Sequence, residues 1–148
     1  MGFLDWAMGN SISGDAEGEE KLLRDCFPTL LQEGERVVFA FLKTTALGNS
    51  YKSFLTDRRL LIREVRGLTG SSVKYKSFAF NNIKAWAVCT AGGVMDTDCE
   101  LIIYPTGMSK IEIEFSKNKV DLFAIQQFLG NSILPKDEVR FAFYKCYQ

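Results

Sequence analysis

Short stretches of apolar residues, alternating or continuous, follow one another along the chain, and most are bounded by turn-forming residues. Residues 51–83 contain three such stretches, separated by a compact turn at 56–59 and by a loop at 66–72 with two glycines and a serine pair. Asp57 favours the first turn, because aspartate tolerates left-handed backbone and can bond the backbone just ahead. Residues 73–76 alternate apolar and basic side chains, the period of a half-buried strand. The region therefore predicts three antiparallel strands.

Four further strands are predicted around this region. Residues 36–44 are apolar on both faces, so the outer face of this strand requires a cover, which either the first helix or another subunit supplies. Residues 83–90 again have two apolar faces. Residues 99–104 form the next strand, and residues 110–115 alternate apolar inward positions with lysine and glutamate outward. Together with the first three, these strands predict a seven-stranded domain.

One helix is predicted before the strands and one after them. Asp15 can cap the first helix, whose early turns are acidic, as suits the positive end of a helix dipole, and Pro28 kinks or ends it near Phe27. The second helix is predicted over 119–133, with Asn118 as its cap and Pro135 as its stop. Most of its circumference is apolar, which is more than a two-sided surface helix requires.

Two stretches resemble motifs of the bacterial pleckstrin-homology (PH) domain family. Residues 55–62, LTDRRLLI, are similar to the family pattern L-T-x-[KR]-R-L-[IL]-I, and residues 75–83, YKSFAFNNI, are similar to Y-x-S-I-P-Y-x-x-I. The chain differs at Ala79, where the family usually has proline, and at Phe80, where tyrosine is common. The resemblance covers roughly residues 1–134.

The resemblance implies a mainly β fold with some α content. Its core is a PH-like, partly open seven-stranded β-barrel, or orthogonal sandwich, capped by a C-terminal α-helix. Residues 1–34 are then an N-terminal helical lead-in, residues 35–134 the barrel, and residues 135–148 a tail of unknown role. The tail is apolar and strand-like in sequence, and the resemblance does not include it. A length of 148 residues is consistent with a single domain overall.

The sequence lacks the patterns that mark most catalytic and metal sites, and although carboxylates alone could serve a hydrolase, their spacing does not suggest a facing pair. There are no histidines, which removes the common general base and the Ser-His and Cys-His pairs. No glycine-rich phosphate loop is present. Residues 96–100 resemble the start of a calcium loop, but Leu101 stands where glycine is needed and Gly107 where glutamate is needed. We expect a non-catalytic protein with no metal and no cofactor.

The four cysteines do not form a C-x-x-C pair, which argues against a zinc site. Free thiols are expected, with a bridge between Cys89 and Cys99 as the alternative if their strands are neighbours. No apolar run approaches the ~20 residues of a membrane span, and no basic region precedes a long apolar one at the N-terminus. We therefore expect a cytoplasmic protein, with membrane association as the alternative.

Apolar residues outnumber what one barrel interior can hide, which predicts self-association. Two strands and the second helix are apolar on more than one face, and the net charge of zero does not oppose association. It also provides no field toward nucleic acid. The resemblance implies closed homo-oligomeric rings. We expect a self-assembling interaction module whose partner is itself, with another protein or a membrane surface as further partners. The residues expected at the interface are Phe3, Trp6, Val38, Leu42, Trp86 and Val88.

The N-terminal apolar cluster around Phe3 and Trp6 leaves two readings open. It either folds back on the barrel or contacts a membrane or a neighbouring chain. A peripheral membrane or phospholipid-binding module is the alternative function. Its candidate cations are Lys43 and Lys52, which flank the first strand pair, but two separated cations make a weak anion clamp and we expect both to be solvated.

Overall fold

The computed structural model describes residues 16–44, 50–67, 72–90, 98–116 and 120–135. Within these ranges, seven antiparallel strands form two sheets, with a helix before them and a helix after them. The elements are α2 (Ala16–Cys26), β1 (Val37–Thr44), β2 (Ser50–Thr56), β3 (Arg59–Arg66), β4 (Ser72–Ala79), the short 3₁₀ helix η1 (Phe80–Asn82), β5 (Ile83–Cys89), β6 (Asp98–Pro105), β7 (Ile111–Ser116) and α3 (Leu122–Ile133).

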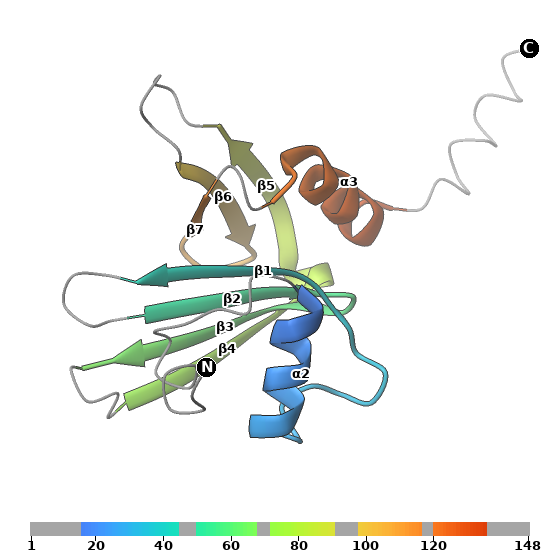
Figure 1. Cartoon of the computed structure of the whole chain (residues 1–148). Coiled ribbons are helices and arrows are strands. Elements are labelled where there is room, and N and C mark those ends of the chain that lie inside the picture. Colours follow the sequence, from blue (N-terminus) through green and yellow to red (C-terminus); the bar gives the residue numbers. More distant parts are fainter. Residues whose placement is uncertain (1–15, 45–49, 68–71, 91–97, 117–119, 136–148) are drawn as a thin grey trace, which may run out of the picture.

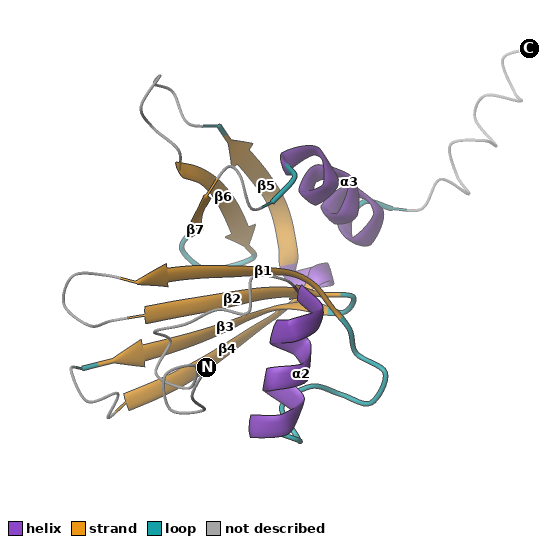
Figure 2. Ribbon diagram, viewed as in Figure 1, coloured by secondary structure: helices purple, strands orange, loops and turns teal. Residues whose placement is uncertain are grey.

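The two sheets cross each other, and each of them is an antiparallel meander. The first has the strand order β1-β2-β3-β4 and the second β5-β6-β7. Helix α2 lies against the outer face of the first sheet, and α3 lies beside β5 at the open corner between the sheets (Figures 1 and 2). The seven-stranded, PH-like fold with its closing helix and its helical lead-in is confirmed.

The inner core fills the space between the two sheets and α3. Leu55 and Leu60 face each other across the β2–β3 pair, and both are fully buried. Helix α3 adds Ile125 and Leu129, also fully buried, while the ring of Phe128 makes edge contacts with two neighbouring phenylalanines. Burying side chains of this size is worth roughly 1.5–3 kcal/mol each, so α3 is a structural part of the barrel.

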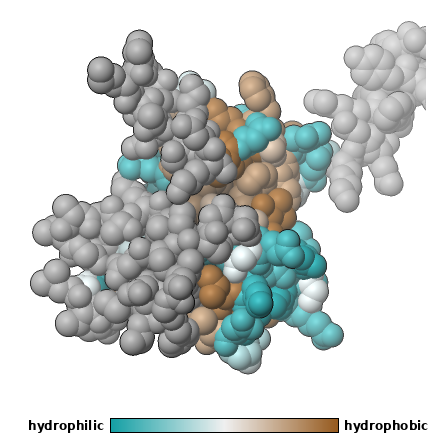
Figure 3. Space-filling model, viewed as in Figure 1, coloured by the Kyte–Doolittle hydropathy of each residue, from teal (hydrophilic) through white to brown (hydrophobic). Residues whose placement is uncertain are grey.

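A second, smaller core lies between α2 and the outer face of the first sheet. Leu23 of α2 is fully buried there against Phe54 and Leu61, which face each other across β2 and β3. Ala40 of β1 packs against the same cluster. Of the two covers that the sequence leaves open for the first strand, the helix is therefore the one observed. Figure 3 shows the exposed side of this helix as hydrophilic.

Trp86 and Val88 do not lie on a free outer face, as the sequence pattern suggested. Both pack against the inner core, and the indole of Trp86 donates a hydrogen bond to the Gln126 side chain of α3. The reason is a register irregularity between Ile83 and Ala85, which shifts the alternation of β5 by one position. The expectation that these two side chains face outward was wrong; both are partly buried, and their part in an interface stays a prediction.

Two local predictions were also wrong in detail. Helix α3 begins at Leu122, three residues later than predicted, and its cap is Asp121, whose carboxylate accepts from the amides of Phe123 and Ala124 at 2.9 and 3.4 Å. At the first turn, none of the described non-glycine residues has positive φ, so Asp57 does not use the left-handed conformation.

Candidate functional site

The LTDRR motif of the β2–β3 turn fastens the lead-in to the barrel. The Arg59 guanidinium binds both oxygens of the Glu35 carboxylate, with Nε at 2.9 Å from Oε1 and Nη2 at 3.0 Å from Oε2. The same Nη2 donates to the carbonyl of Leu30 at 2.7 Å. Thr56 donates from its hydroxyl to Glu35 at 2.8 Å. Two of the polar residues of the motif, Thr56 and Arg59, thus converge on one carboxylate that precedes β1.

Glu35 is completely buried and is held as a carboxylate by its donors. Burial alone raises the pKa of its carboxyl group, but hydrogen bonds from Arg59, from the Gln32 amide and from Thr56 outweigh it and hold the pKa below the usual value. Gly34 directs the chain here with a φ of 72°, a conformation that suits glycine. The bidentate geometry is the strong form of a charge-assisted pair.

A second pair of contacts joins the same turn to the start of β1. The Asp57 carboxylate accepts from the Arg36 amide at 3.0 Å, and the Asp57 amide donates to the Arg36 carbonyl at 2.9 Å. The turn itself is held by Thr56, whose hydroxyl oxygen accepts from the amides of Arg58 and Arg59. Asp57 therefore hydrogen-bonds to Arg36 before β1, whereas the sequence pattern predicted a bond to the backbone of the residues just ahead in its own turn.

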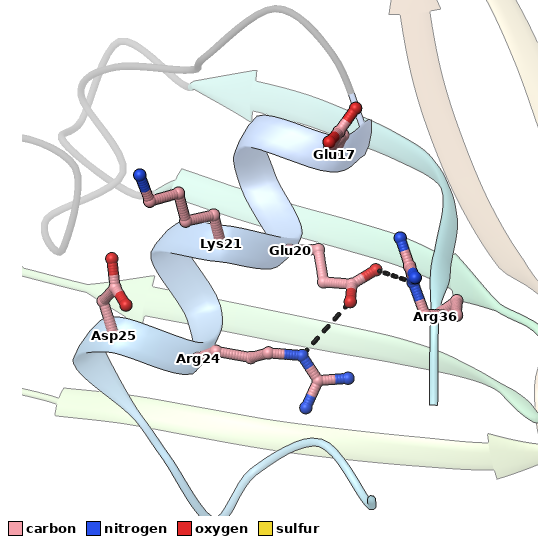
Figure 4. Close-up of a pocket in the computed structure, with 6 residues that line it drawn as sticks. All are labelled: Glu17, Glu20, Lys21, Arg24, Asp25 and Arg36. Atoms are coloured by element: carbon pink, nitrogen blue, oxygen red, sulfur yellow. Dashed lines mark hydrogen bonds and ion pairs between the residues drawn. The ribbon is translucent and has the colours of Figure 1, made fainter. Parts of the chain in front are cut away.

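Glu20 of α2 forms the next anchor, at the edge of a shallow hollow. Its carboxylate accepts from Arg24 at 3.1 Å, from Arg36 at 3.0 Å and from the Val37 amide at 2.9 Å (Figure 4). Burial alone raises the pKa of Glu20, and these bonds outweigh it and hold the pKa below its ordinary value. The hollow has a volume of about 280 Å³. Its lining residues are Glu17, Glu20, Lys21, Arg24, Asp25 and Arg36.

The charges around this hollow balance, with three carboxylates and three cations. Glu20 already bridges Arg24 and Arg36, so these two cations are engaged by the protein itself. Arg24 also donates to the Glu35 carbonyl, which connects this anchor to the previous one. The arrangement is a polar clasp between α2 and β1 and has no net field for a charged small molecule.

Lys52 is buried beneath α2, contrary to the expectation that it is solvated. Its ammonium group lies 3.4 Å from the Glu19 carboxylate, and both side chains are only 2% exposed. Burial lowers the pKa of Lys52 to about 8, although the Glu19 charge opposes this shift. The register of the sheet explains the position, because Lys52 shares the outer face of β2 with Phe54, which α2 covers. It is therefore not presented to an anionic ligand.

The other expected site residues lie in several places. Val38 is 36% exposed at the irregular start of β1, so it is available at the surface. The backbone of Leu42 and Lys43 belongs to β1, but their side chains lie outside the described part of the structure. Phe3 and Trp6 lie outside the described residues altogether. Of the expected interface, Val38 is the residue that the structure places on the outside.

Another buried carboxylate occupies the end of the barrel that bears the β3–β4 loop. Glu64 is 1% exposed and pairs with Lys76 at 3.1 Å and with Arg66. Burial alone raises its pKa, and the bonds from these two cations outweigh that effect and lower it. In the sheet register Glu64 lies between Tyr51 and Lys74. Two cations at this end are thus engaged by an internal carboxylate.

Among the described strands, β4 forms one edge of the first sheet. It pairs with β3 through an unbroken register from Arg59–Ala79 to Arg66–Ser72, and it is the last strand in the sheet order. Most of its residues are exposed, and Val73 and Tyr75 expose 43% and 38% of their surface. An exposed and regular strand edge is able to pair with another strand.

The remaining chemistry is sparse in the part of the chain that the structure describes. No group of three or more potential metal-ligating side chains occurs there, and no helix in those ranges is long and apolar enough to cross a membrane. Cys26, Cys89 and Cys99 are free thiols, and Cys146 lies outside the described residues. Cys89 is exposed and opposes Glu100, while its neighbour Cys99 is buried, so the two thiols lie on opposite faces of the second sheet.

The sequence contained one signal for the buried network that was not used. The sequence pattern accounts for Glu19 and Glu20 as acids that suit the positive end of the helix dipole and assigns no role to Glu35, yet each of the three is nearly inaccessible. Buried acids require partners, and the two arginines of the turn motif are unusual residues for a tight hairpin. That combination could have suggested an ion pair between the lead-in and the turn.

Comparison with known proteins agrees with this architecture. The model of the family described as Bacterial PH domain matches residues 2–133. The uncharacterized protein YjqA of Bacillus subtilis is 32% identical over 133 residues, which cover 88% of this chain and 97% of that protein.

Two crystal structures of Shewanella proteins are also similar. A protein with a pleckstrin-homology domain from Shewanella loihica has a TM-score of 0.61 at 25% identity, covering 78% of this chain and 92% of that one. A PH domain from Shewanella amazonensis has a TM-score of 0.56 at 29% identity, covering 90% of this chain and all of that one. The sequence match and the shared fold together show that this chain belongs to the bacterial PH domain family.

Proposed function

We propose that this protein is a non-catalytic interaction module that assembles with copies of itself. The observation that carries the proposal is the edge that β4 forms among the described strands. Val73 is exposed there, and so is part of Tyr75, whose ring also packs on Phe27 and whose hydroxyl accepts from Arg63. The other three edge strands have further neighbours: β1 contacts both α2 and β7, and β5 contacts α3. The β4 edge is thus the least covered of the four.

Further exposed apolar side chains support an assembly rather than a single small contact. Phe123, at the start of α3, exposes 85% of its surface, Met108 60% and Leu134 57%. Single exposed apolar residues are normal, but several large ones on a domain of 16.7 kDa favour a protein partner. The zero net charge presents no long-range repulsion between copies.

The proposed interface differs from the one expected from sequence. Trp86 and Val88 are used internally, and α2 covers Ala40 and Val37 on the outer side of β1. Exposed Val38 stays a candidate contact from the original set. The module takes a protein partner, namely itself, and needs neither a cofactor nor nucleic acid.

Light scattering coupled to size exclusion, in the absence of lipid, tests the proposal. We expect a mass several times 16.7 kDa that does not change over a wide concentration range. Val73→Asp should reduce the mass, because it places a charge on the β4 edge without removing a buried group. Gln127→Asp, on the exposed side of α3, is the matched control and should leave the mass unchanged.

A monomer at all concentrations would remove the proposal and favour the membrane alternative. Of the two candidate lipid-binding cations, Lys52 is not accessible to a membrane, since it is buried and paired with Glu19. Sedimentation with anionic liposomes measures it directly. Strong binding that falls with salt and falls again in Lys43→Ala would support a membrane-surface role in place of self-assembly.

A further inference from the structure

We propose that residues 139–147 of one copy add a strand to the β4 edge of the neighbouring copy. The inference deepens the proposed self-assembly, because it names the segment that covers the edge. It rests on two features that lie far apart in the sequence: an edge strand with no partner strand on its outer side among the described residues, and an apolar C-terminal segment with strand periodicity.

The β4 edge has the properties of an acceptor strand. It is eight residues long, contains no proline and has no register shift, so its outward backbone groups follow one regular ladder. Val73 and Tyr75 project on one face and Lys74 on the other. An added strand would find Val73 and the exposed part of Tyr75 on one side, where the Tyr75 ring packs on Phe27 and its hydroxyl accepts from Arg63, and a cation on the other.

The C-terminal segment has the properties of a donor strand. Val139, Phe141 and Phe143 alternate with Arg140 and Ala142, which is the two-residue period of a strand. Its nine residues match the eight of β4 in length. The segment lies beyond residues 2–133 that match the family, so the barrel and its closing helix are complete without it. A short apolar segment of this kind gains most by covering another apolar edge.

The neighbouring copy is favoured over the same copy as the acceptor. The five residues 134–138 span at most ~17 Å when fully extended. Figure 1 shows α3 on the side of the barrel that carries β5, and it shows the start of β4 at the opposite end of the first sheet. The exposed Val73 lies at that start. A segment from another copy reaches this end without having to fold back around the barrel.

Charge is compatible with the pairing. The segment is preceded by Asp137 and Glu138, and β4 presents Lys74 on its exposed surface. Lys76 on the same strand is held by Glu64. Opposite charges at the ends of a paired strand favour one register over a slipped one.

The native Cys146 provides the probe for a cross-linking experiment. The background for the experiment is the full-length chain with Cys89→Ser, which removes the exposed thiol of the barrel. Into this background one new cysteine at a time is introduced on β4, as Val73→Cys, Lys74→Cys or Ser77→Cys. A disulfide forms only when two Cα atoms lie within about 7 Å, so a bridge reports strand pairing. We expect a covalent dimer on a non-reducing gel for at least one position, and its loss in Cys146→Ser.

A second measurement separates this inference from the proposed function. Phe141→Asp/Phe143→Asp in the full-length chain should reduce the assembled mass at least twofold, while the matched pair Gln127→Asp/Asn131→Asp on α3 should not. A cross-link within one chain would overturn the inference, as would an assembled double aspartate variant of unchanged mass; both leave self-assembly intact. A full-length protein that is monomeric throughout overturns the proposed function as well.

Discussion

Removing the charge of Glu35 should destabilise the fold more than any surface substitution. Glu35→Gln keeps the shape of the side chain but replaces a fully buried carboxylate that accepts from Arg59, Thr56 and the Gln32 amide. Losing one partner of a buried ion pair costs about 3–5 kcal/mol, because the other charge stays behind. Arg59 retains 21% side-chain exposure and can regain water, so we expect the lower end, about 3 kcal/mol.

Urea unfolding followed by circular dichroism at fixed protein concentration measures this loss, since association would otherwise change the apparent stability. A change of about 3 kcal/mol corresponds to a melting temperature roughly 6–12 °C lower for a chain of this size. Glu112→Gln is the matched control. Glu112 pairs with Lys110 at the surface, and losing that pair should cost less than about 1 kcal/mol.

The pH dependence of the free energy of unfolding tests the role of Glu35 independently. The folded pKa of Glu35 lies below its unfolded value, so the carboxylate stabilises the protein above the unfolded pKa and this stabilisation disappears as the pH falls through the folded pKa. The difference between wild type and Glu35→Gln should therefore be full at pH 7 and shrink in acid. A loss below 1 kcal/mol at pH 7, or a difference that grows in acid, would refute the role assigned to this carboxylate.

Two further predictions concern buried groups. Burial lowers the pKa of Lys52 to about 8, so between pH 8 and the usual lysine value the unfolded chain binds one more proton than the folded chain. As the pH rises through that window, the free energy of unfolding of the wild type, measured with urea, should increase relative to that of Lys52→Met. Parallel plots of the two free energies against pH would contradict the burial of this charge. A thiol reagent should label exposed Cys89 in the native protein, and it should label buried Cys99 only after unfolding. The Cys89→Ser variant should lose one labelled thiol per native chain. The unfolded, non-reduced chain should contain four free thiols, and a count of two would indicate a disulfide.

The order of the elements could be predicted from the sequence because each depends on local information. Turn residues and two-residue alternation defined the strands, and prolines defined the ends of both helices. Alternation failed in β5, where the irregular register after Ile83 turns Trp86 inward. A bulge changes which face a side chain occupies without changing the residue types around it, so no pattern of apolar positions reveals it.

The buried charges could not be placed for a related reason. Lysine is usually a surface residue, so the sequence around Lys52 predicts exposure. Lys52 is buried because α2 crosses the outer face of the sheet, and its partner Glu19 lies 33 positions earlier in the sequence. The apolar positions were detected from the sequence, which left the first helix or another subunit as the cover of the first strand. In the structure α2 covers the first sheet and α3 closes the open corner, and these are contacts between distant segments.

The motif that identifies the family has a structural task in this protein, which bears on where its function is to be sought. Thr56 and Arg59 form hydrogen bonds with Glu35, with Leu30 and within the turn itself, and Asp57 forms its hydrogen bond with Arg36. None of these groups points to a ligand. In this chain the turn motif therefore joins the lead-in to the barrel, and it does not indicate a partner. The features that we propose for partner binding are therefore those that the motif does not use: the exposed edge of β4 and the apolar segment that follows the closing helix in the sequence.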